Sequence, residues 1–448
     1  YTDGSGNLDD ITISAGATTG TVLFTPTNDS VYEGNETATV AINSVSGGSA
    51  TESGSQSVTI TITDNESAPT VTLSTSATSI AENAGSSLTL TATLSVATTA
   101  DVTVALSTSG TATEGTDYTD GSGNVDDITI SAGSTTGTVS FTPTDDSVYE
   151  GNETATIAIS SVTGEASESG TQAVTITITE NESAPTVTLY MKIDSLGFEY
   201  ASTSINESNS SKSIRIEAKL SGATDEDVTV ALSTSGTATE GTDYTDGSGN
   251  LDDITISAGS TTGSINFIRS DDSVYEGDET ATIAISSVSG GSATESGSQS
   301  VTITISEDES APTVTLSTSA TSIAENAGSS LTITATLSTA TTADVTVTIG
   351  TAGTATEGTD YTDGSGNLDD ITISAGSTTG TVSFTPTDDA SDPVYEENET
   401  AIISIDGVSG GSASESGSQS VTITITENES APTVTLARSA ASIAEDCM

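Results

Sequence analysis

Apolar and polar residues alternate along short segments of the chain, with Val, Ile and Leu at every second position and Thr at most positions between them. This two-residue period is typical of β-strands that bury one face, and no segment shows the 3.6-residue period of an amphipathic helix. Gly, Ser and Asp fill the turns between the segments, so we expect an all-β chain built from immunoglobulin-like β-sandwiches. In residues 69–184 the pattern predicts seven strands, A to G: Thr70–Ser74, Ser87–Ser95, Asp101–Ser107, Asp127–Ser131, Thr138–Thr142, Thr154–Val162 and Ala173–Thr179.

The same pattern recurs along the chain. The segment YTDGSGN begins at Tyr1, Tyr118, Tyr244 and Tyr361, at spacings of 117, 126 and 117 residues. A unit of this length is too long for a solenoid repeat and suits an independent sandwich domain. The Pro of each SAPTVTL segment marks a boundary, and the chain opens inside a motif, so we interpret it as a fragment of a longer repetitive protein. We predict a rod of five units, named repeats 1 to 5, of which the first and last are partial: residues 1–68, 69–184, 185–311, 312–431 and 432–448.

Acidic residues fall in particular loops of the predicted sandwich. If the strands alternate in direction, the A–B, C–D and E–F loops and the end of strand G share one end, which we call the tip. In repeat 2 the tip collects eight carboxylates: Glu82, Asp117, Asp145, Asp146, Glu150, Glu153, Glu180 and Glu182. Carboxylates crowded in this way repel one another unless a cation lies among them. The alternative is that they are solvated turn residues, which explains a single Asp more easily than a set from four segments.

The amino-acid composition excludes several kinds of catalytic and binding site. The chain has 64 Asp and Glu against 6 Lys and Arg, a net charge of −58, with no His and one Cys. Without His there is no His-based triad or His-ligated zinc, and a single Cys forms no intrachain disulfide. So negative a chain repels nucleic acid and anionic lipid, and no apolar run is long enough for a membrane helix. The metal ligands that this composition still offers are oxygen atoms. They suit Ca²⁺ better than Mg²⁺ because Ca²⁺ accepts crowded, irregular coordination.

Three motifs carry a family resemblance. GTATEGTDY occurs at residues 110–118, 236–244 and 353–361, SIAENAG at 79–85 and 322–328, and DDSVYEGNE at 145–153. In this order, and over essentially the whole chain, they resemble the signature of the Calx-beta domain family. The resemblance implies a calcium-binding immunoglobulin-like sandwich, of the kind found in sodium/calcium exchangers, in integrin β4 and in bacterial surface proteins and adhesins.

The resemblance also implies a ligand set: a Glu early in each domain, the Asp before Tyr, the acids of the E–F loop and an acidic run after strand G. The early Glu and the Asp before Tyr become Glu82, Glu207 and Glu325, and Asp117, Asp243 and Asp360. The E–F loops supply Asp29, Glu33 and Glu36; Asp145, Asp146, Glu150 and Glu153; Asp271, Asp272, Glu276 and Glu279; and Asp388, Asp389, Glu396 and Glu399. The run after G supplies Asp64 and Glu66; Glu180 and Glu182; Glu307, Asp308 and Glu309; and Glu427 and Glu429.

The chain departs from the family at two of these positions. Three successive Asp of the exchanger type become Glu-Asn-Glu or Glu-Asp-Glu after strand G, which implies fewer or weaker ions at each tip. The E–F loop of repeat 4 carries an insertion, DDASDPVYEENE, which leaves its ligands open. Because the end of G is both ligand donor and linker, bound Ca²⁺ is expected to tie each tip to the next repeat and stiffen the rod.

We therefore expect a Ca²⁺-rigidified stalk or filament segment of an extracellular or cell-surface adhesin, with no catalytic activity. The alternative is a regulatory calcium sensor of the exchanger type, against which several near-copies in one chain argue. Carboxylate pairs also serve glycosidases, but aromatic residues that would stack a sugar make up only 3% of the chain.

Three weaker sequence features each have more than one interpretation. Asp120, Ser122, Asn124 and Asp126 have the spacing of half an EF-hand loop, although a turn explains them as well. Asn-Glu-Ser and Asn-Glu-Thr triplets match N-glycosylation sequons but fall within the acidic loops. Four of the six cations lie between residues 190 and 220, where repeat 3 carries nine extra residues, so this region is a candidate surface for lateral contact with another acidic rod.

Overall fold

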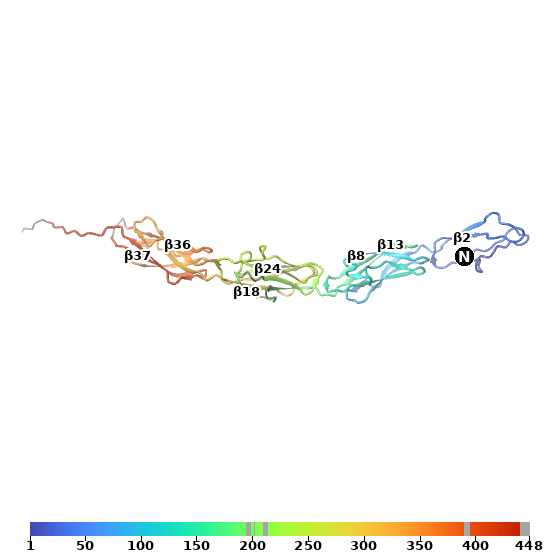
Figure 1. Cartoon of the computed structure of the whole chain (residues 1–448), viewed down its shortest axis with the longest axis horizontal. Coiled ribbons are helices and arrows are strands. Elements are labelled where there is room, and N and C mark those ends of the chain that lie inside the picture. Colours follow the sequence, from blue (N-terminus) through green and yellow to red (C-terminus); the bar gives the residue numbers. More distant parts are fainter. Residues whose placement is uncertain (194–198, 201, 209–213, 389–394, 440–448) are drawn as a thin grey trace, which may run out of the picture.

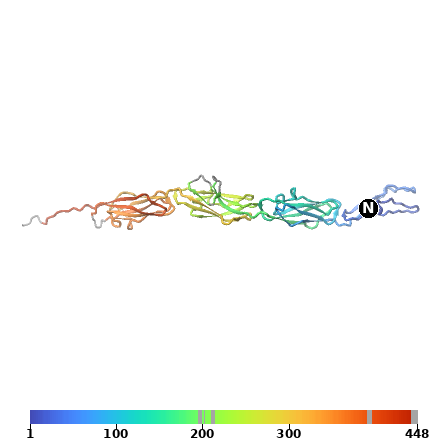
Figure 2. The same ribbon diagram turned by 90° about the horizontal axis from the view of Figure 1, so that it is seen from below.

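The computed structural model describes residues 1–193, 199–200, 202–208, 214–388 and 395–439. All regular secondary structure in these ranges is β, so none of the residues described forms a helix that could span a membrane. The repeats follow one another along a single extended rod (Figure 1), and a quarter turn about the long axis leaves the outline equally narrow (Figure 2).

Repeat 2 is a sandwich of two five-stranded sheets, with strand orders β14-β4-β6-β11-β9 and β10-β8-β13-β15-β5. The first sheet contains β14 (Ser167–Glu168), β4 (Thr70–Thr75), β6 (Leu88–Leu94), β11 (Thr136–Pro143) and β9 (Tyr118–Thr119). The second contains β10 (Ile128–Ile130), β8 (Val102–Gly110), β13 (Glu153–Thr163), β15 (Ala173–Thr179) and β5 (Ser79–Ala81).

Repeat 4 keeps this arrangement, and repeat 3 differs in having a sixth strand, β17, which pairs with β16 in the first sheet. In repeat 3 the strands are β16 (Thr186–Ile193), β17 (Glu199–Tyr200), β18 (Ser202–Asn206), β19 (Ile214–Leu220), β21 (Val228–Gly236), β22 (Tyr244–Thr245), β23 (Ile254–Ile256), β24 (Thr262–Arg269), β26 (Glu279–Ser289), β27 (Thr294–Glu295) and β28 (Ser300–Ser306). In repeat 4 they are β29 (Thr313–Thr318), β30 (Ser322–Ala324), β31 (Leu331–Leu337), β33 (Val345–Gly353), β34 (Tyr361–Thr362), β35 (Ile371–Ile373), β36 (Thr379–Pro386), β37 (Glu399–Ser409), β38 (Ser414–Glu415) and β39 (Ser420–Thr426). Repeat 1 contributes the hairpin of β2 (Glu36–Ala41) and β3 (Ser57–Ile62).

Each complete repeat has its own apolar core between the sheets. The alternating Val, Ile and Leu residues point inward, as the sequence pattern predicts, and an aromatic pair lies in the middle. In repeat 2, Tyr118 and Phe141 are fully buried and stack with their ring centroids 4.6 Å apart. The buried Tyr is the last residue of the GTATEGTDY motif, so packing this ring fixes the position of the acidic residue before it.

All seven predicted strands are present, with ends shifted by a few residues, but the sequence did not reveal β5. This short strand leaves the sheet of β4 and pairs in parallel with β15 on the opposite sheet. Ile80 is its only buried apolar residue, so no alternation could be read there. The crossing of the chain from one sheet to the other at β5 determines which residues lie together at the tip.

Neighbouring repeats are joined by small parallel pairs of strands. At each of three junctions, a short strand in the E–F loop of one repeat pairs with a short strand between B and C of the following repeat. The pairs are β1 (Val31–Tyr32) with β7 (Ala97–Thr98), β12 (Val148–Tyr149) with β20 (Ala223–Thr224), and β25 (Val274–Tyr275) with β32 (Ala340–Thr341). Thr98, Thr224 and Thr341 are almost fully buried in these pairs. The tips of repeats 1, 2 and 3 therefore contact the opposite end of the following repeat directly, in addition to the covalent linker.

Candidate metal centre

Parallel pairing of β5 with β15 brings two distant acidic residues together. Ala81, the last residue of β5, is opposite Thr179, the last residue of β15, so the next residues, Glu82 and Glu180, leave the sheet side by side. The same register places Glu207 beside Glu307 and Glu325 beside Glu427. We call the resulting groups the G-end clusters; each has carboxylate oxygens within 4.8 Å of one another, and they are Glu82, Glu180 and Glu182; Glu207, Glu307, Asp308 and Glu309; and Glu325, Glu427 and Glu429.

A second group lies at the same tip, on the side of the E–F loop. In repeat 2 it contains Asp117, which precedes the buried Tyr118, together with Glu150 and Glu153 at the start of β13. In repeat 3 it contains Asp243, Glu276 and Glu279. We call these the E–F clusters. Burial raises the pKa of Glu150 to about 7, with smaller contributions from the charges of Asp117, Asp146 and Glu82, the last of which belongs to the G-end cluster.

The remaining predicted ligands lie at the same tips. In repeat 4, Glu325, Asp360, Glu396, Glu399 and Glu427 line one hollow. In repeat 1, Asp29, Glu33, Glu36, Asp64 and Glu66 line another. Asp145, Asp271 and Asp388 are exposed, while Asp146 and Asp272 accept backbone hydrogen bonds from Val148 and Val274 at the start of the junction strands. Asp389 lies outside the described residues.

The first Glu after strand G also holds the loop in place. One oxygen of Glu180 accepts hydrogen bonds from the N–H groups of Glu150 (2.6 Å) and Gly151 (2.8 Å), and the other accepts from Asn181 and Glu182. Glu307 makes the same contacts to Glu276 and Gly277. Desolvation raises the pKa of Glu180, but these backbone donors outweigh it and the pKa is lowered. This residue therefore positions the E–F loop in addition to offering an oxygen.

Most other tip carboxylates are shifted in the opposite direction. Burial, followed by the charges of Glu180, Glu182 and Asp146, raises the pKa of Glu82 to about 7, although the N–H of Asp146 hydrogen-bonds to it. Burial and Asp117 raise the pKa of Glu153 to about 7 as well. In repeats 3 and 4, burial raises the pKa of Glu207, Glu279 and Glu399 to about 7. Without a cation, the folded tips resist full ionisation.

We therefore expect the calcium-free chain to lose stability as the pH rises. Each raised carboxyl group binds its proton more tightly in the folded than in the unfolded chain, so its contribution is present below about pH 4.5 and is lost as the pH rises through about 7. Glu427, whose pKa backbone N–H groups lower to about 2, acts in the opposite sense, but only at acidic pH. Thermal unfolding in chelator should give a lower melting temperature at pH 8 than at pH 5, and a constant or rising value would contradict the crowding described here.

The donor set at the tips fits Ca²⁺. All the converging side chains are carboxylates, and one oxygen of Glu182 is buried without a hydrogen-bond partner among the described residues, as expected for an atom placed to bind a cation. Asn35, Asn152 and Asn398 of the candidate sequons accept hydrogen bonds from the backbone N–H groups of Asp64, Glu180 and Glu427, so their side chains are part of the tip architecture.

The EF-hand-like spacing forms a turn. Oδ1 of Asp120 accepts hydrogen bonds from the N–H of Ser122 (2.7 Å), the hydroxyl of Ser122 (2.9 Å) and the N–H of Gly123 (3.1 Å). Asp246 and Asp363 repeat this turn. The first oxygen of the EF-hand-like series, Oδ1 of Asp120, is thus engaged within the loop.

One acidic residue of the tips was missed from sequence because it belongs to the next repeat. The N–H of Asp225, directly after β20, hydrogen-bonds to the carbonyl oxygen of Tyr149 (3.4 Å), next to Glu150. Burial and then Asp117 raise the pKa values of Glu150 and Glu153, and the charge of Asp225 adds a smaller contribution in the same direction. Repeats 2 and 4 have Thr99 and Thr342 at this position, so the only available signal was the change from Thr to Asp in one copy.

The chain matches a known family model along nearly all of its length. The Calx-beta domain profile matches residues 1–66, 64–182, 192–309 and 307–429. Among solved structures, CBD12 from CALX1.2 is 15% identical over 53% of this chain and 100% of its own, with a TM-score of 0.24. The apo-form Calx CBD1 domain is 20% identical over 27% of this chain and 99% of its own, at a TM-score of 0.22. Invasin, a bacterial integrin-binding protein, is 14% identical over 80% of this chain and 60% of its own, at a TM-score of 0.26. No curated protein sequence matches the chain.

Proposed function

Because the chain belongs to the Calx-beta domain family, we propose that it is a non-catalytic, calcium-binding stalk segment of an extracellular or cell-surface adhesin. Ca²⁺ would bind at the tip of each repeat, in the G-end and E–F clusters. The observation that carries the proposal is that the parallel register of β5 with β15 brings carboxylates from distant segments within 4.8 Å of one another in repeat after repeat.

The ion sites and the junctions share the same loop. In repeat 2, Glu150 directly follows β12, the strand that pairs with β20 of repeat 3. Glu150 is a member of the E–F cluster, and its N–H is held by Glu180. A cation that fixes this carboxylate also fixes the strand beside it. Ca²⁺ is therefore expected to stiffen the connection between repeats, whereas electrostatic repulsion loosens it when the ion is absent.

The 2/3 junction has an additional carboxylate. Asp225 of repeat 3 hydrogen-bonds through its backbone N–H to Tyr149, next to Glu150 of the E–F cluster of repeat 2, while the 1/2 and 3/4 junctions have Thr99 and Thr342. Without a cation, Asp225 adds repulsion between the repeats, and with Ca²⁺ it adds attraction across the junction. We infer that this connection depends most strongly on calcium.

Small-angle X-ray scattering during a Ca²⁺ titration tests the proposal. We expect the chain to become longer and less flexible as Ca²⁺ rises to external, roughly millimolar concentrations. The variant Asp225→Thr gives the 2/3 junction the residue of the other two, and it should reduce the difference between the calcium-free and calcium-bound chain. A shape change completed at submicromolar Ca²⁺ would favour the sensor alternative, and identical scattering with Ca²⁺ and with chelator would exclude both.

We also propose lateral contact between copies through the basic face of repeat 3. Tyr190 and Lys192 of β16 lie beside Glu217 of β19, with 3.8 Å between Nζ of Lys192 and Oε2 of Glu217. Lys219 on the same strand is exposed. Lys212, one of the four cations between residues 190 and 220, lies outside the described residues. The partner would be the acidic surface of a second chain, and sedimentation that changes between low and high salt is the test.

A further inference from the structure

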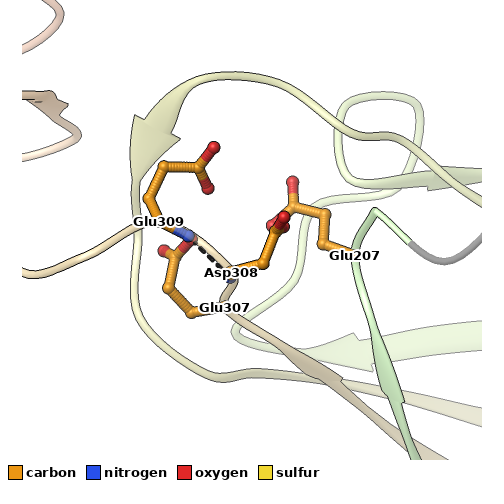
Figure 3. Close-up of side chains that lie close together, drawn as sticks. All are labelled: Glu207, Glu307, Asp308 and Glu309. Atoms are coloured by element: carbon orange, nitrogen blue, oxygen red, sulfur yellow. Dashed lines mark hydrogen bonds between the residues drawn. The ribbon is translucent and has the colours of Figure 1, made fainter.

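The G-end cluster of repeat 3 differs from its equivalents by one carboxylate. The residue after Glu307 is Asp308, where repeats 1, 2 and 4 have Asn65, Asn181 and Asn428. Oxygens of Glu207, Glu307, Asp308 and Glu309 all lie within 4.8 Å of one another. Figure 3 shows the carboxyl groups of Glu207 and Asp308 pointing toward one another.

In the other repeats the Asn occupies an oxygen that could otherwise bind an ion. The side-chain amide of Asn181 donates to Oε1 of Glu182 (2.9 Å), that of Asn428 to Oε1 of Glu429 (2.8 Å), and that of Asn65 to Oε1 of Glu66 (3.2 Å). Asp308 has no such donor group. Repeat 3 thus gains a carboxylate and also leaves the Glu309 side chain without this amide contact.

A second observation points to a ligand at this site. The Glu207 side chain is only 8% exposed, and no residue in the described part of the chain donates a hydrogen bond to its carboxylate. Its counterpart Glu82 receives a hydrogen bond from the N–H of Asp146. Glu207 is a largely buried residue whose carboxylate lies within 4.8 Å of three others and has no donor among the described residues, an arrangement that a cation would complete.

Other substitutions near the tip do not cancel this difference. Arg269 stands where repeats 2 and 4 have Pro143 and Pro386, and its Nε donates to the carbonyl oxygen of Asn206 (2.9 Å), beside Glu207. Asp278 replaces the neutral Asn152 and Asn398, and its Oδ1 accepts from the N–H of Glu307. In the count of formal charges, the positive charge gained with Arg269 equals the negative charge gained with Asp278. Asp308 remains as an additional potential ligand.

From this arrangement we infer that the G-end site of repeat 3 binds Ca²⁺ more tightly than its equivalents and fills first as Ca²⁺ rises. The inference rests on the proposed calcium-binding function and adds a ranking among its sites. Calcium would then stabilise the described rod from repeat 3 outward, because the cluster holds the E–F loop of β25 through Glu307 and so reaches the 3/4 junction.

Hydrogen exchange of the full chain during a Ca²⁺ titration, followed by mass spectrometry, tests the ranking. Residues 174–189 and 421–436 are identical, so peptides that cover the ends of β15 and β39 report each site separately when they extend to Tyr190 and Ala437; the β28 peptide already differs at Ser306 and Asp308. We expect protection at the end of β28 at roughly tenfold lower Ca²⁺ than at the other two, about the effect of 1.4 kcal/mol. Asp308→Asn should move that midpoint up to the others, and Asn181→Asp should move the repeat 2 midpoint down.

Glu165→Gln is the control, because it removes one exposed charge at the end of repeat 2 opposite the tip and should leave all midpoints unchanged. Coincident midpoints in the wild-type chain, or a repeat 3 midpoint that Asp308→Asn does not move, would overturn the ranking. Absence of Ca²⁺-dependent protection at every tip would instead contradict the proposed function itself.

Discussion

Calcium should raise the melting temperature of this chain by roughly 10 °C or more, because a site held at a hundred times its Kd adds about 2.7 kcal/mol and each kcal/mol is worth about 4–8 °C in a small domain. The physical reason is that Ca²⁺ neutralises carboxylates that burial and like charges disfavour, among them Glu82 and Glu207, which are 6% and 8% exposed. Differential scanning calorimetry of the full chain in millimolar Ca²⁺ and in chelator measures the effect.

Two comparisons make this calorimetric result specific. Mg²⁺ at the same concentration should stabilise the chain much less, because it demands a tighter octahedron and keeps its water. High salt should relieve only part of the repulsion, since the buried groups are screened less than exposed ones. Equal melting temperatures in Ca²⁺ and chelator would show that the tips do not bind calcium in a way coupled to folding.

Neutralising one tip carboxylate should have opposite effects with and without calcium. Glu153 begins β13 and shares the E–F cluster with Asp117 and Glu150. In chelator at pH 8, Glu153→Gln removes a charge that Asp117 and Glu150 repel, so the tip of repeat 2 should become more stable. In Ca²⁺ the same change removes a ligand, and we expect affinity at that site to fall about tenfold, equivalent to about 1.4 kcal/mol.

Hydrogen exchange of a peptide that spans the start of β13 and extends to Ile157 resolves both effects, since Val40 and Asp278 distinguish the corresponding peptides of repeats 1 and 3. Glu165→Gln serves as the control because it is the same substitution at an exposed position at the opposite end of the same repeat. A variant that is stabilised under both conditions would indicate that Glu153 is merely repelled and does not bind the ion. A variant that is destabilised under both would indicate a structural role instead.

The sequence predicted the sandwich and the acidic tip because both follow from local patterns. Alternating Val and Ile define the strands, and a Pro and a buried Tyr recur at fixed positions in each repeat. It did not predict β5, because Ile80 alone gives no alternation, although the register of β5 with β15 is what places Glu82 beside Glu180. The ligand set came from family resemblance and not from the pattern itself.

Contacts between repeats were beyond sequence reasoning for a different reason. Asp225 follows strand B of repeat 3 and looks like an ordinary acidic turn residue, and only the parallel pairing of β12 with β20 places it beside Glu150. The loop-holding role of Glu180 was equally hidden, because it depends on backbone N–H groups about thirty residues earlier in the chain. Tertiary register, which no local pattern encodes, determines both.

The most direct test of calcium binding at the tips is anomalous X-ray scattering from crystals of this chain grown with Ca²⁺. We predict anomalous peaks among the carboxylates of the G-end and E–F clusters of repeats 2 and 3, for example between Glu82 and Glu182 and between Glu207 and Asp308, and none at the opposite ends of the sandwiches. Tips without such peaks at millimolar Ca²⁺, or peaks distributed over the sides of the rod, would contradict the account.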